Sequence, residues 1–192
     1  NRKIIKKLRY KGEEVSQYLF ERTLREPDRF LAIQLLNCIS TCQDQKLRKK
    51  MLAEAKKTSD EFIFATYISL FKRAGMPEAL STVRKALQSS PDNRVRANAA
   101  EYMAEFGELK DIKLLEDMLD HPSNRVKINC LMAVARICER TRNGAVDQLK
   151  MLSAGEDPAA SESARFALRE MKVRLQKKPI GINLMEFLTQ NY

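Results

Sequence analysis

The chain has 192 residues, of which 44% are hydrophobic, 31% are charged and 7% are aromatic, and its formal net charge is +10. This length permits one domain or one repeat array with a buried core. No stretch approaches the roughly 18–20 apolar residues that a membrane-spanning helix needs, and residues 1–7 are too charged for a signal peptide. Because the sequence begins with Asn rather than Met, we expect it to be part of a longer protein.

The positive charge is concentrated at the two ends of the chain. Residues 1–10 carry five cations and no carboxylate, residues 172–192 have a net charge of +3, and residues 11–171 have only +2. This distribution predicts at most weak binding of nucleic acid or an anionic surface, carried by the basic termini. Four cysteines in a chain without a signal peptide favour a reduced, cytoplasmic location.

An internal repeat of about 32 residues organises the sequence. The string Pro-Asp-Asn-Arg-Val-Arg at 91–96 is matched 31 residues later by Pro-Ser-Asn-Arg-Val-Lys at 122–127. Asp28, Asp60 and Asp92 are spaced by 32 residues, and Asp157 continues the series. Each of these residues precedes an apolar pattern with helical period. The repeat therefore predicts an all-α fold of about five helical hairpins.

In chain order, residues 1–10 are interpreted as a basic remnant of an earlier helix, or as a cap. The predicted hairpins that follow span residues 11–43, 44–75, 76–107, 108–140 and 143–173. Their first helices are expected at 12–25, 45–57, 77–89, 109–120 and 144–154. Their second helices begin after short polar N-cap residues, which are Asp28, Asp60, Asp92, Ser123 and Asp157. Gly75, Gly107 and Gly144 are expected near the turns.

Each second helix has four apolar residues on one face, at the spacing i, i+4, i+7, i+8. These candidate core sets are Leu31, Leu35, Cys38 and Ile39; Ile63, Tyr67, Leu70 and Phe71; Val95, Ala99, Tyr102 and Met103; Val126, Cys130, Ala133 and Val134; and Ala160, Ala164, Ala167 and Leu168. Residues 174–192 contain a Pro-Ile-Gly turn followed by further apolar residues. We expect this segment to form a C-terminal cap, or a tail that docks on a partner or on a neighbouring domain.

Two strings in the second helices carry a family resemblance. Val95-Arg96 followed by Ala99, and Val126-Lys127 followed by Cys130, come after a turn with Pro, Asp or Asn. Over about residues 11–173 the chain resembles the HEAT-repeat family in its short bacterial form. The resemblance implies a right-handed α-solenoid whose second helices line the concave side. It also implies that Arg96 and Lys127 bond to neighbouring turns, and that the array serves as a scaffold, which does not fix one function.

Candidate catalytic groups are few in this sequence. His121 is the single histidine and lies beside Pro122, where we interpret it as an exposed turn residue. Cys38 and Cys42 are expected on one helix face, three repeats from Cys130 and Cys138, so the two pairs are too far apart to share one zinc ion. We interpret the cysteines as small buried side chains, and the acidic residues between 105 and 120 as a solvated face. The sequence thus predicts no enzyme, no metal and no cofactor.

Nucleic-acid binding is the main alternative to protein binding. Six cations could contact phosphates, namely Arg94, Arg96, Arg125, Lys127, Arg136 and Arg140. HEAT-like enzymes that excise alkylated bases use aromatic side chains and a carboxylate in the groove, whereas this chain has no Trp. Other short-repeat relatives attach bilin pigments to light-harvesting proteins, but no residue here can be assigned that role. A further alternative is an accessory or regulatory domain of a larger protein.

A column of short polar residues is the candidate binding surface. Aligning the five second helices by their apolar residues places these side chains at one position: Gln34, Thr66, Asn98, Asn129 and Ser163. One turn further along lie Asn37, Ser69, Glu101, Met132 and Arg136. We predict that both groups face the concave side and hold a protein partner, much as the related armadillo repeats hold an extended peptide. The alternative is that the polar column bonds between layers or faces water. The leading hypothesis is a non-catalytic protein-binding scaffold.

Overall fold

The computed structural model describes residues 12–175, and within this range all regular secondary structure is helical. The predicted cap at 1–10 lies outside the described residues, as does the predicted cap or docking tail at 174–192, apart from the end of the last helix. The first helices are α2 (Gly12–Leu24), α4 (Gln45–Lys57), α6 (Leu80–Ser89), α8 (Ile112–Glu116) and α10 (Glu139–Ser153). The second helices are α3 (Arg29–Cys38), α5 (Glu61–Arg73), α7 (Asn93–Phe106), α9 (Asn124–Ile137) and α11 (Pro158–Leu175). Short 3-10 helices, η1 (Pro77–Ala79) and η2 (Leu109–Asp111), precede α6 and α8.

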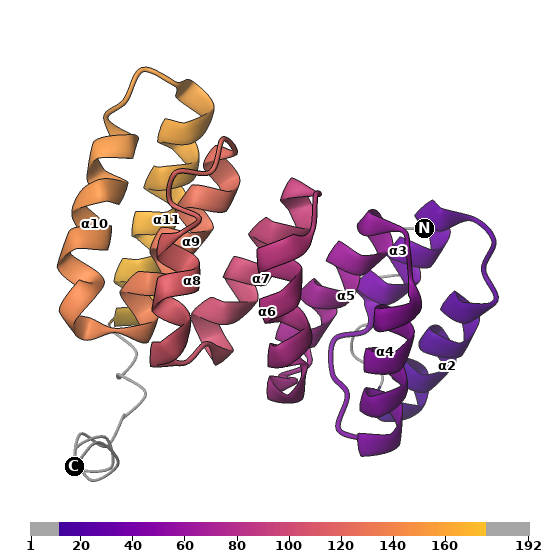
Figure 1. The fold of residues 1–192 in the computed structure, drawn as a ribbon. Helices are drawn as coiled ribbons and strands as arrows, with labels where there is room; N and C mark the ends of the chain where they lie inside the picture. Colours follow the sequence, from indigo (N-terminus) through magenta and orange to yellow (C-terminus); the bar gives the residue numbers. More distant parts are fainter. Residues whose placement is uncertain (1–11, 176–192) are drawn as a thin grey trace, which may run out of the picture.

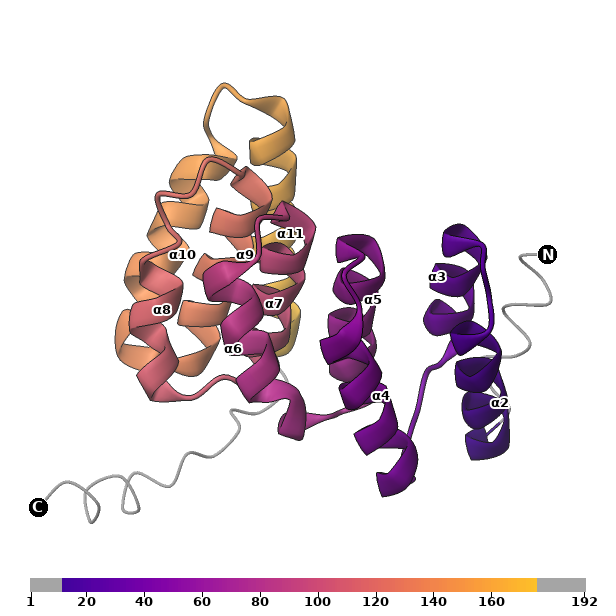
Figure 2. The same cartoon turned by 45° about the vertical axis from the view of Figure 1, so that its right-hand side comes forward.

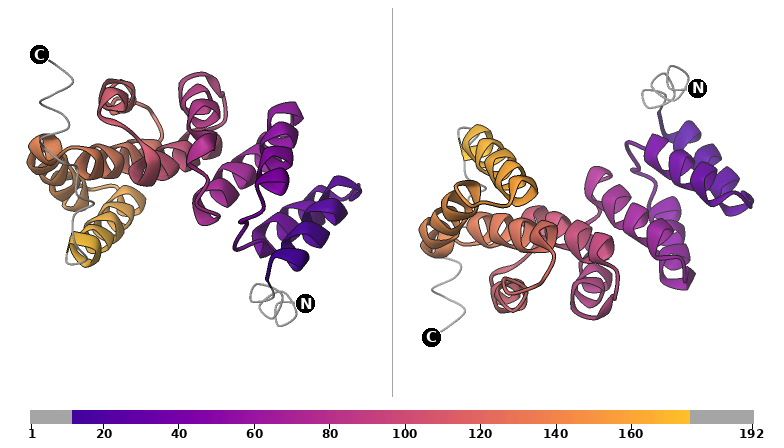
Figure 3. Two further views of the ribbon diagram at one scale, coloured as in Figure 1. Left: turned by 90° about the horizontal axis from the view of Figure 1, so that it is seen from below. Right: turned by 90° about the horizontal axis from the view of Figure 1, so that it is seen from above.

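The hairpins stack into a helical solenoid. Each second helix packs on the next one along the array, from α3 through α5, α7 and α9 to α11, and the contact between α7 and α9 is the most extensive (Figures 1 and 2). In the views along the vertical axis, α6 and α8 lie on one side of this row and α11 turns towards the other (Figure 3). The predicted all-α architecture of repeated hairpins is therefore confirmed.

The N-cap residues anticipated from the sequence begin the second helices. The carboxylates of Asp28, Asp60 and Asp92 each accept hydrogen bonds from two backbone N–H groups in the first turn of α3, α5 and α7. Asp157 does the same for α11, accepting from the N–H groups of Ala159 and Ala160. Ser123 occupies the N-cap position of α9 but makes no capping bond with its side chain. These bonds satisfy N–H groups that have no partner inside the helix.

The candidate core sets are buried most completely in the middle of the array. In α7 and α9 all eight predicted residues are buried, and Met103 is 0% exposed. In the first repeat the expectation was wrong for Leu31, which is 45% exposed, and Leu35 is only partly buried. Their counterparts on α7 and α9 are completely buried. Among the described residues, α3 is the first of the second helices, so no earlier second helix packs on it there.

The junction of the fourth and fifth repeats differs from the predicted one. Helix α8 ends at Glu116 rather than near 120, and α10 begins at Glu139 rather than at 144. Only Cys138, with an extended backbone at φ −131° and ψ 122°, separates α9 from α10. Gly144 therefore lies inside α10 rather than at a turn. A Cβ atom at this position would meet no atom of a neighbouring element within 4 Å. The glycine therefore lowers the stability of α10 only through its low helix propensity, by about 1 kcal/mol relative to Ala. Gly75 does occupy a turn, with φ +61°.

Buried charged residues tie consecutive repeats together. The Arg48 Nε of α4 donates to Glu78 Oε1 of the next repeat at 2.7 Å, and Arg84 of α6 donates to both carboxylate oxygens of Asp111, at 2.6 and 2.9 Å. Asp111 is buried, which corrects the interpretation of the whole acidic region as a solvated face. Arg96 Nε donates to the Ser90 carbonyl at 2.6 Å, as the family resemblance implied.

Candidate functional site: the concave groove

The predicted polar column does not face solvent along its whole length. Gln34 and Ser163, at the two ends, are exposed. Thr66 is only 9% exposed, and its hydroxyl donates to the Phe62 carbonyl at 2.8 Å within the same helix. This hydroxyl therefore donates inside α5, and the side chain has little exposed surface.

The middle of the column bonds successive second helices to each other. Asn98 Nδ2 donates to the Ala65 carbonyl and to Ser69 Oγ, both at 2.9 Å, and its Oδ1 accepts from Arg125 at 2.9 Å. Asn129 Nδ2 donates in the same way to the Ala97 carbonyl, at 2.9 Å. The two asparagines thus satisfy backbone carbonyls of the preceding helix. Asn98 has no donor left for a bound peptide.

A groove opens on the concave side where α5, α7, α9 and α11 meet. It has a volume of about 480 Å³. Five predicted site residues line it: Glu101, Asn129, Met132, Arg136 and Ser163. The other five lie outside it: Gln34, Asn37, Thr66, Ser69 and Asn98. We call this cavity the concave groove, and it occupies the C-terminal half of the array.

Phe166 is the aromatic residue among the groove residues that the sequence reasoning missed. It lies on α11 and is 56% exposed, although large aromatic side chains are usually buried. The signal was present, because Phe166 follows Met132 by the same 34-residue step that separates Asn129 from Ser163. The buried Ile128 and the partly buried Met132 supply further apolar surface to the groove.

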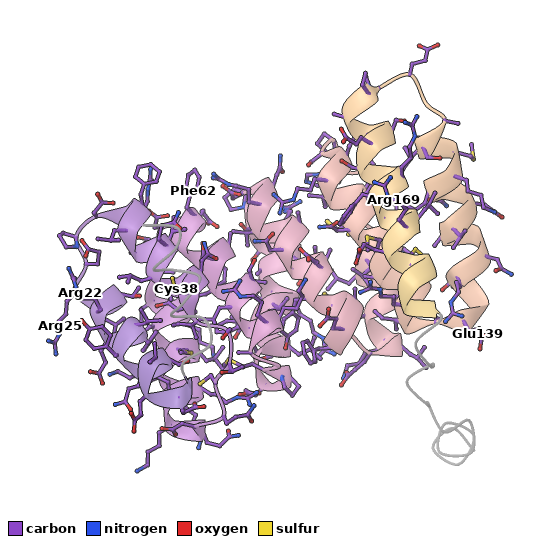
Figure 4. All side chains as sticks on the ribbon, turned by 180° about the vertical axis from the view of Figure 1, so that it is seen from behind. Arg22, Arg25, Cys38, Phe62, Glu139 and Arg169 are labelled. Atoms are coloured by element: carbon purple, nitrogen blue, oxygen red, sulfur yellow. The ribbon has the colours of Figure 1, made fainter. Side chains whose placement is uncertain are left out.

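The charges of the groove nearly balance. Its lining includes four cations, Lys72, Arg125, Arg136 and Arg169, and three carboxylates, Glu101, Glu162 and Glu170. The Lys72 ammonium pairs with Glu101, which joins α5 to α7. Arg169, on α11, is labelled in the view from behind (Figure 4). A surface of mixed charge around an aromatic side chain suits a protein segment better than a polyanion, which needs an excess of positive charge.

The groups considered for chemistry lie apart from this groove. His121 is half-buried rather than exposed, and its Nδ1 accepts from the Ser123 N–H at 3.0 Å. Burial, with the nearby Arg96 and Lys127, lowers the pKa of His121. Cys42 lies in the loop after α3, so it does not share a helix face with Cys38 as expected. Burial raises the pKa of the Cys130 thiol to about 12, which keeps it protonated and a poor nucleophile. Among residues 12–175, no three potential ligands cluster as a metal site would require.

The repeats described above also match a known protein family. The sequence model of the HEAT-repeat family matches residues 34–135, which is more than half of the chain. The chain belongs to the HEAT-repeat family. The matched range runs from α3 to α9 and so includes the asparagine bonds described above, while α11, which completes the groove, lies beyond it. HEAT repeats commonly act as protein-interaction scaffolds. No curated protein matches this HEAT chain, and no helix in its described part is long and apolar enough to cross a membrane.

Proposed function

We propose that this HEAT array is a non-catalytic protein-binding module and that its concave groove holds a segment of the partner. The observation that carries the proposal is the exposed Phe166 in a groove built from four second helices. Partly exposed aromatic side chains beside apolar and charged residues are typical of the residues that dominate binding energy at protein interfaces. A cytoplasmic location belongs to the same proposal, and the four cysteines are free thiols, as they are in reducing compartments.

The residues assigned to binding are those that line the groove and retain accessible surface. Met132 and Phe166 would supply the apolar contact, while Ser163, Arg136 and Glu101 would supply polar contacts around it. Asn98 and Thr66 support the array from within and are not part of this set. The proposed mode of binding therefore differs from a continuous ladder of amides along the whole solenoid.

The first experiment identifies the partner and separates the two classes of ligand. The intact chain is used to capture proteins from extracts of the source cells, with and without nuclease treatment. A protein captured equally well in both samples supports the proposal. Capture that disappears after nuclease treatment contradicts it, because nucleic acid would then bridge the two molecules.

The second experiment assigns the captured protein to the groove. We expect Phe166→Ala, and separately Met132→Ala, to weaken binding of that protein by about 1–3 kcal/mol with unchanged helix content. Met151→Ala is the matched control, because Met151 is 75% exposed on α10 and does not line the groove. Equal affinities for all three variants would place the binding surface elsewhere.

A further inference from the structure

Helix α4 concentrates the positive charge of the repeat array. It contains six cations and one carboxylate, a net charge of +5, whereas residues 11–171 together have a net charge of +2. The rest of that range is therefore negative overall, with a net charge of −3. The net charge of the array as a whole hides this concentration on a single helix.

Five lysines form one exposed face of α4. They are spaced three, four, ten and eleven residues from the first, and at 3.6 residues per turn they occupy roughly a third of the helix circumference: Lys46, Lys49, Lys50, Lys56 and Lys57. We call these five residues the lysine face. Leu47, Met51 and Ala55, on the opposite side of α4, are buried. The packing of α4 in the core therefore directs the lysine face towards solvent.

The charge of the lysine face is almost uncompensated. Lys57 pairs with Glu54 at 2.8 Å, and its side chain remains 70% exposed. Among residues 12–175, the other four lysines form no ion pair. Like charges three or four residues apart, such as those of Lys46 and Lys50, repel each other on a helix. An anion bound along this face would relieve that repulsion.

We propose that the lysine face binds the phosphate backbone of double-stranded nucleic acid, without regard to base sequence. Non-specific binding of a duplex requires chiefly closely spaced cations, because it is driven by the release of counterions from the phosphates. From Lys46 to Lys57 the face is about 16 Å long at 1.5 Å per residue. This length matches about five phosphates of one strand, at 3.4 Å per phosphate. The proposal is independent of the concave groove, because no residue of α4 lines that groove.

The composition of the lysine face favours a duplex over a protein or a single strand. Apart from the lysines, its exposed surface contains only Ala53, and α4 has no aromatic residue. Protein interfaces depend on apolar and aromatic residues, and lysine is depleted in them. Proteins that bind single strands usually add aromatic side chains on which the bases stack. The backbone of a duplex requires neither.

The shape of the basic surface favours a nucleic acid over a membrane. Helices that bind at a membrane surface insert apolar side chains, whereas those of α4 are buried in the core. The basic surface is also narrow, because Lys50 Nζ lies 5.9 Å from the centroid of the Phe20 ring on α2. Helix α2 has three carboxylates and one arginine. A planar anionic surface would approach these carboxylates as well, whereas one strand of a duplex can follow α4 alone.

The test is a titration of a fluorescent DNA duplex of about 20 base pairs with the full chain, at several salt concentrations. Lys46→Gln, Lys50→Gln and Lys56→Gln together remove three charges from the lysine face. We expect this triple variant to bind about tenfold or more weakly near 50 mM salt. The slope of log affinity against log salt should become shallower by about 2.7, at 0.9 per phosphate contact. Helix content should be unchanged, because Gln and Lys have similar helix propensities.

The matched control removes three exposed lysines elsewhere in the array, by Lys85→Gln, Lys110→Gln and Lys150→Gln. Both triple variants have the same net charge and the same basic termini. Because charges beyond about 10 Å are largely screened at 0.1 M salt, this control should stay within about threefold of the parent. Phe166→Ala, in the concave groove, should bind the duplex as the parent does. A failure of this proposal is thus distinguishable from a failure of the proposed function.

Four results would overturn the proposal. The first is equal weakening by the two triple variants, since only net charge would then matter. The second is parent-like affinity of the α4 variant, because the basic termini would then hold the duplex. The third is tighter, α4-dependent binding to vesicles of anionic lipid than to the duplex at the same salt concentration. The last is competition by polyglutamate as effective as that by unlabelled duplex, because the face would then suit an acidic protein segment.

Discussion

Asp92 shows how one carboxylate contributes to stability at the scale of a single residue. It accepts hydrogen bonds from the Arg94 N–H at 2.7 Å and from Arg94 Nε at 3.0 Å. The hydrogen bond from the Arg94 side chain, followed by those from the backbone, lowers the pKa of Asp92 to about 2. A lowered pKa in the folded state means that this contribution is complete above the ordinary value of 3.8 and is lost as the pH falls towards 2.

We therefore predict that the effect of Asp92→Ala depends on pH. Its free energy of unfolding in urea should lie about 1 kcal/mol below that of the parent at neutral pH, a usual cost for a lost N-cap. The difference should shrink between about pH 4 and pH 2, as the parent loses the same contribution. Asp147→Ala serves as the control, because Asp147 only pairs with Lys150 at an exposed site. A difference that is constant across this pH range would contradict the assignment.

The asparagine column gives a second prediction for single residues. Asn98→Ala with Asn129→Ala removes four hydrogen bonds between successive second helices. We expect a loss of about 1 kcal/mol of stability for each asparagine. Asn98→Ala alone should leave the affinity for a partner in the concave groove unchanged, because Asn98 does not line it. Ser163→Ala, at the exposed end of the column, should leave the melting temperature unchanged. A large loss of affinity at an unchanged melting temperature would instead assign the asparagines to recognition.

At the scale of elements, α7 is the central helix of the array, packed between α5 and α9. Met103→Asp would place a charge where the side chain is 0% exposed. We expect it to lower the free energy of unfolding by several kcal/mol, since a buried unpaired charge is among the most destabilising changes. Met151→Asp is the control at a site that is 75% exposed. Thermal melts followed by circular dichroism would compare the two, and equal melting temperatures would show that the core of α7 is assigned wrongly.

The sequence predicts a structural feature when the residues that produce it lie within one helix, and misses it when they come from different repeats. The N-cap of α5 at Asp60 and the buried face of α7 follow from spacing alone, because both arise within one helix. The burial of Asp111 does not, since its partner Arg84 comes from the previous repeat. The start of α10 was missed because Gly144, usually a turn residue, is accommodated in an open position on that helix.

At the scale of the whole molecule, the site depends on how the layers stack. Half of the residues in the aligned columns line the concave groove, including Met132 and Asn129. They could not show that the groove opens only where α11 turns towards the concave side, because this turn is set by packing between helices (Figure 3). They also could not distinguish Leu31 from Val95, since both have the same pattern, and only Val95 has an earlier layer before it within the described part of the chain.

The last helix, α11, carries exposed charged residues, and they lead to a prediction about truncation. Because Glu162, Arg165 and Arg169 need no cover, a chain ending at residue 175 should keep its helix content and melt within about 3 °C of the full chain, a shift equivalent to about 1 kcal/mol. A chain ending at residue 138 should behave differently, because Ile128, Leu131 and Ala135 would then face water. Burial of each of the two larger side chains contributes about 1.5–3 kcal/mol.

Because a repeat array is stabilised mainly by contacts between neighbouring layers, the loss of the last layer should lower the melting temperature strongly and promote aggregation. Thermal melts and light scattering on the two truncated chains would separate these outcomes. If the chain ending at residue 175 melted as early as the shorter one, residues 176–192 would be an essential cap, and the polar face of α11 would not be the end of the array.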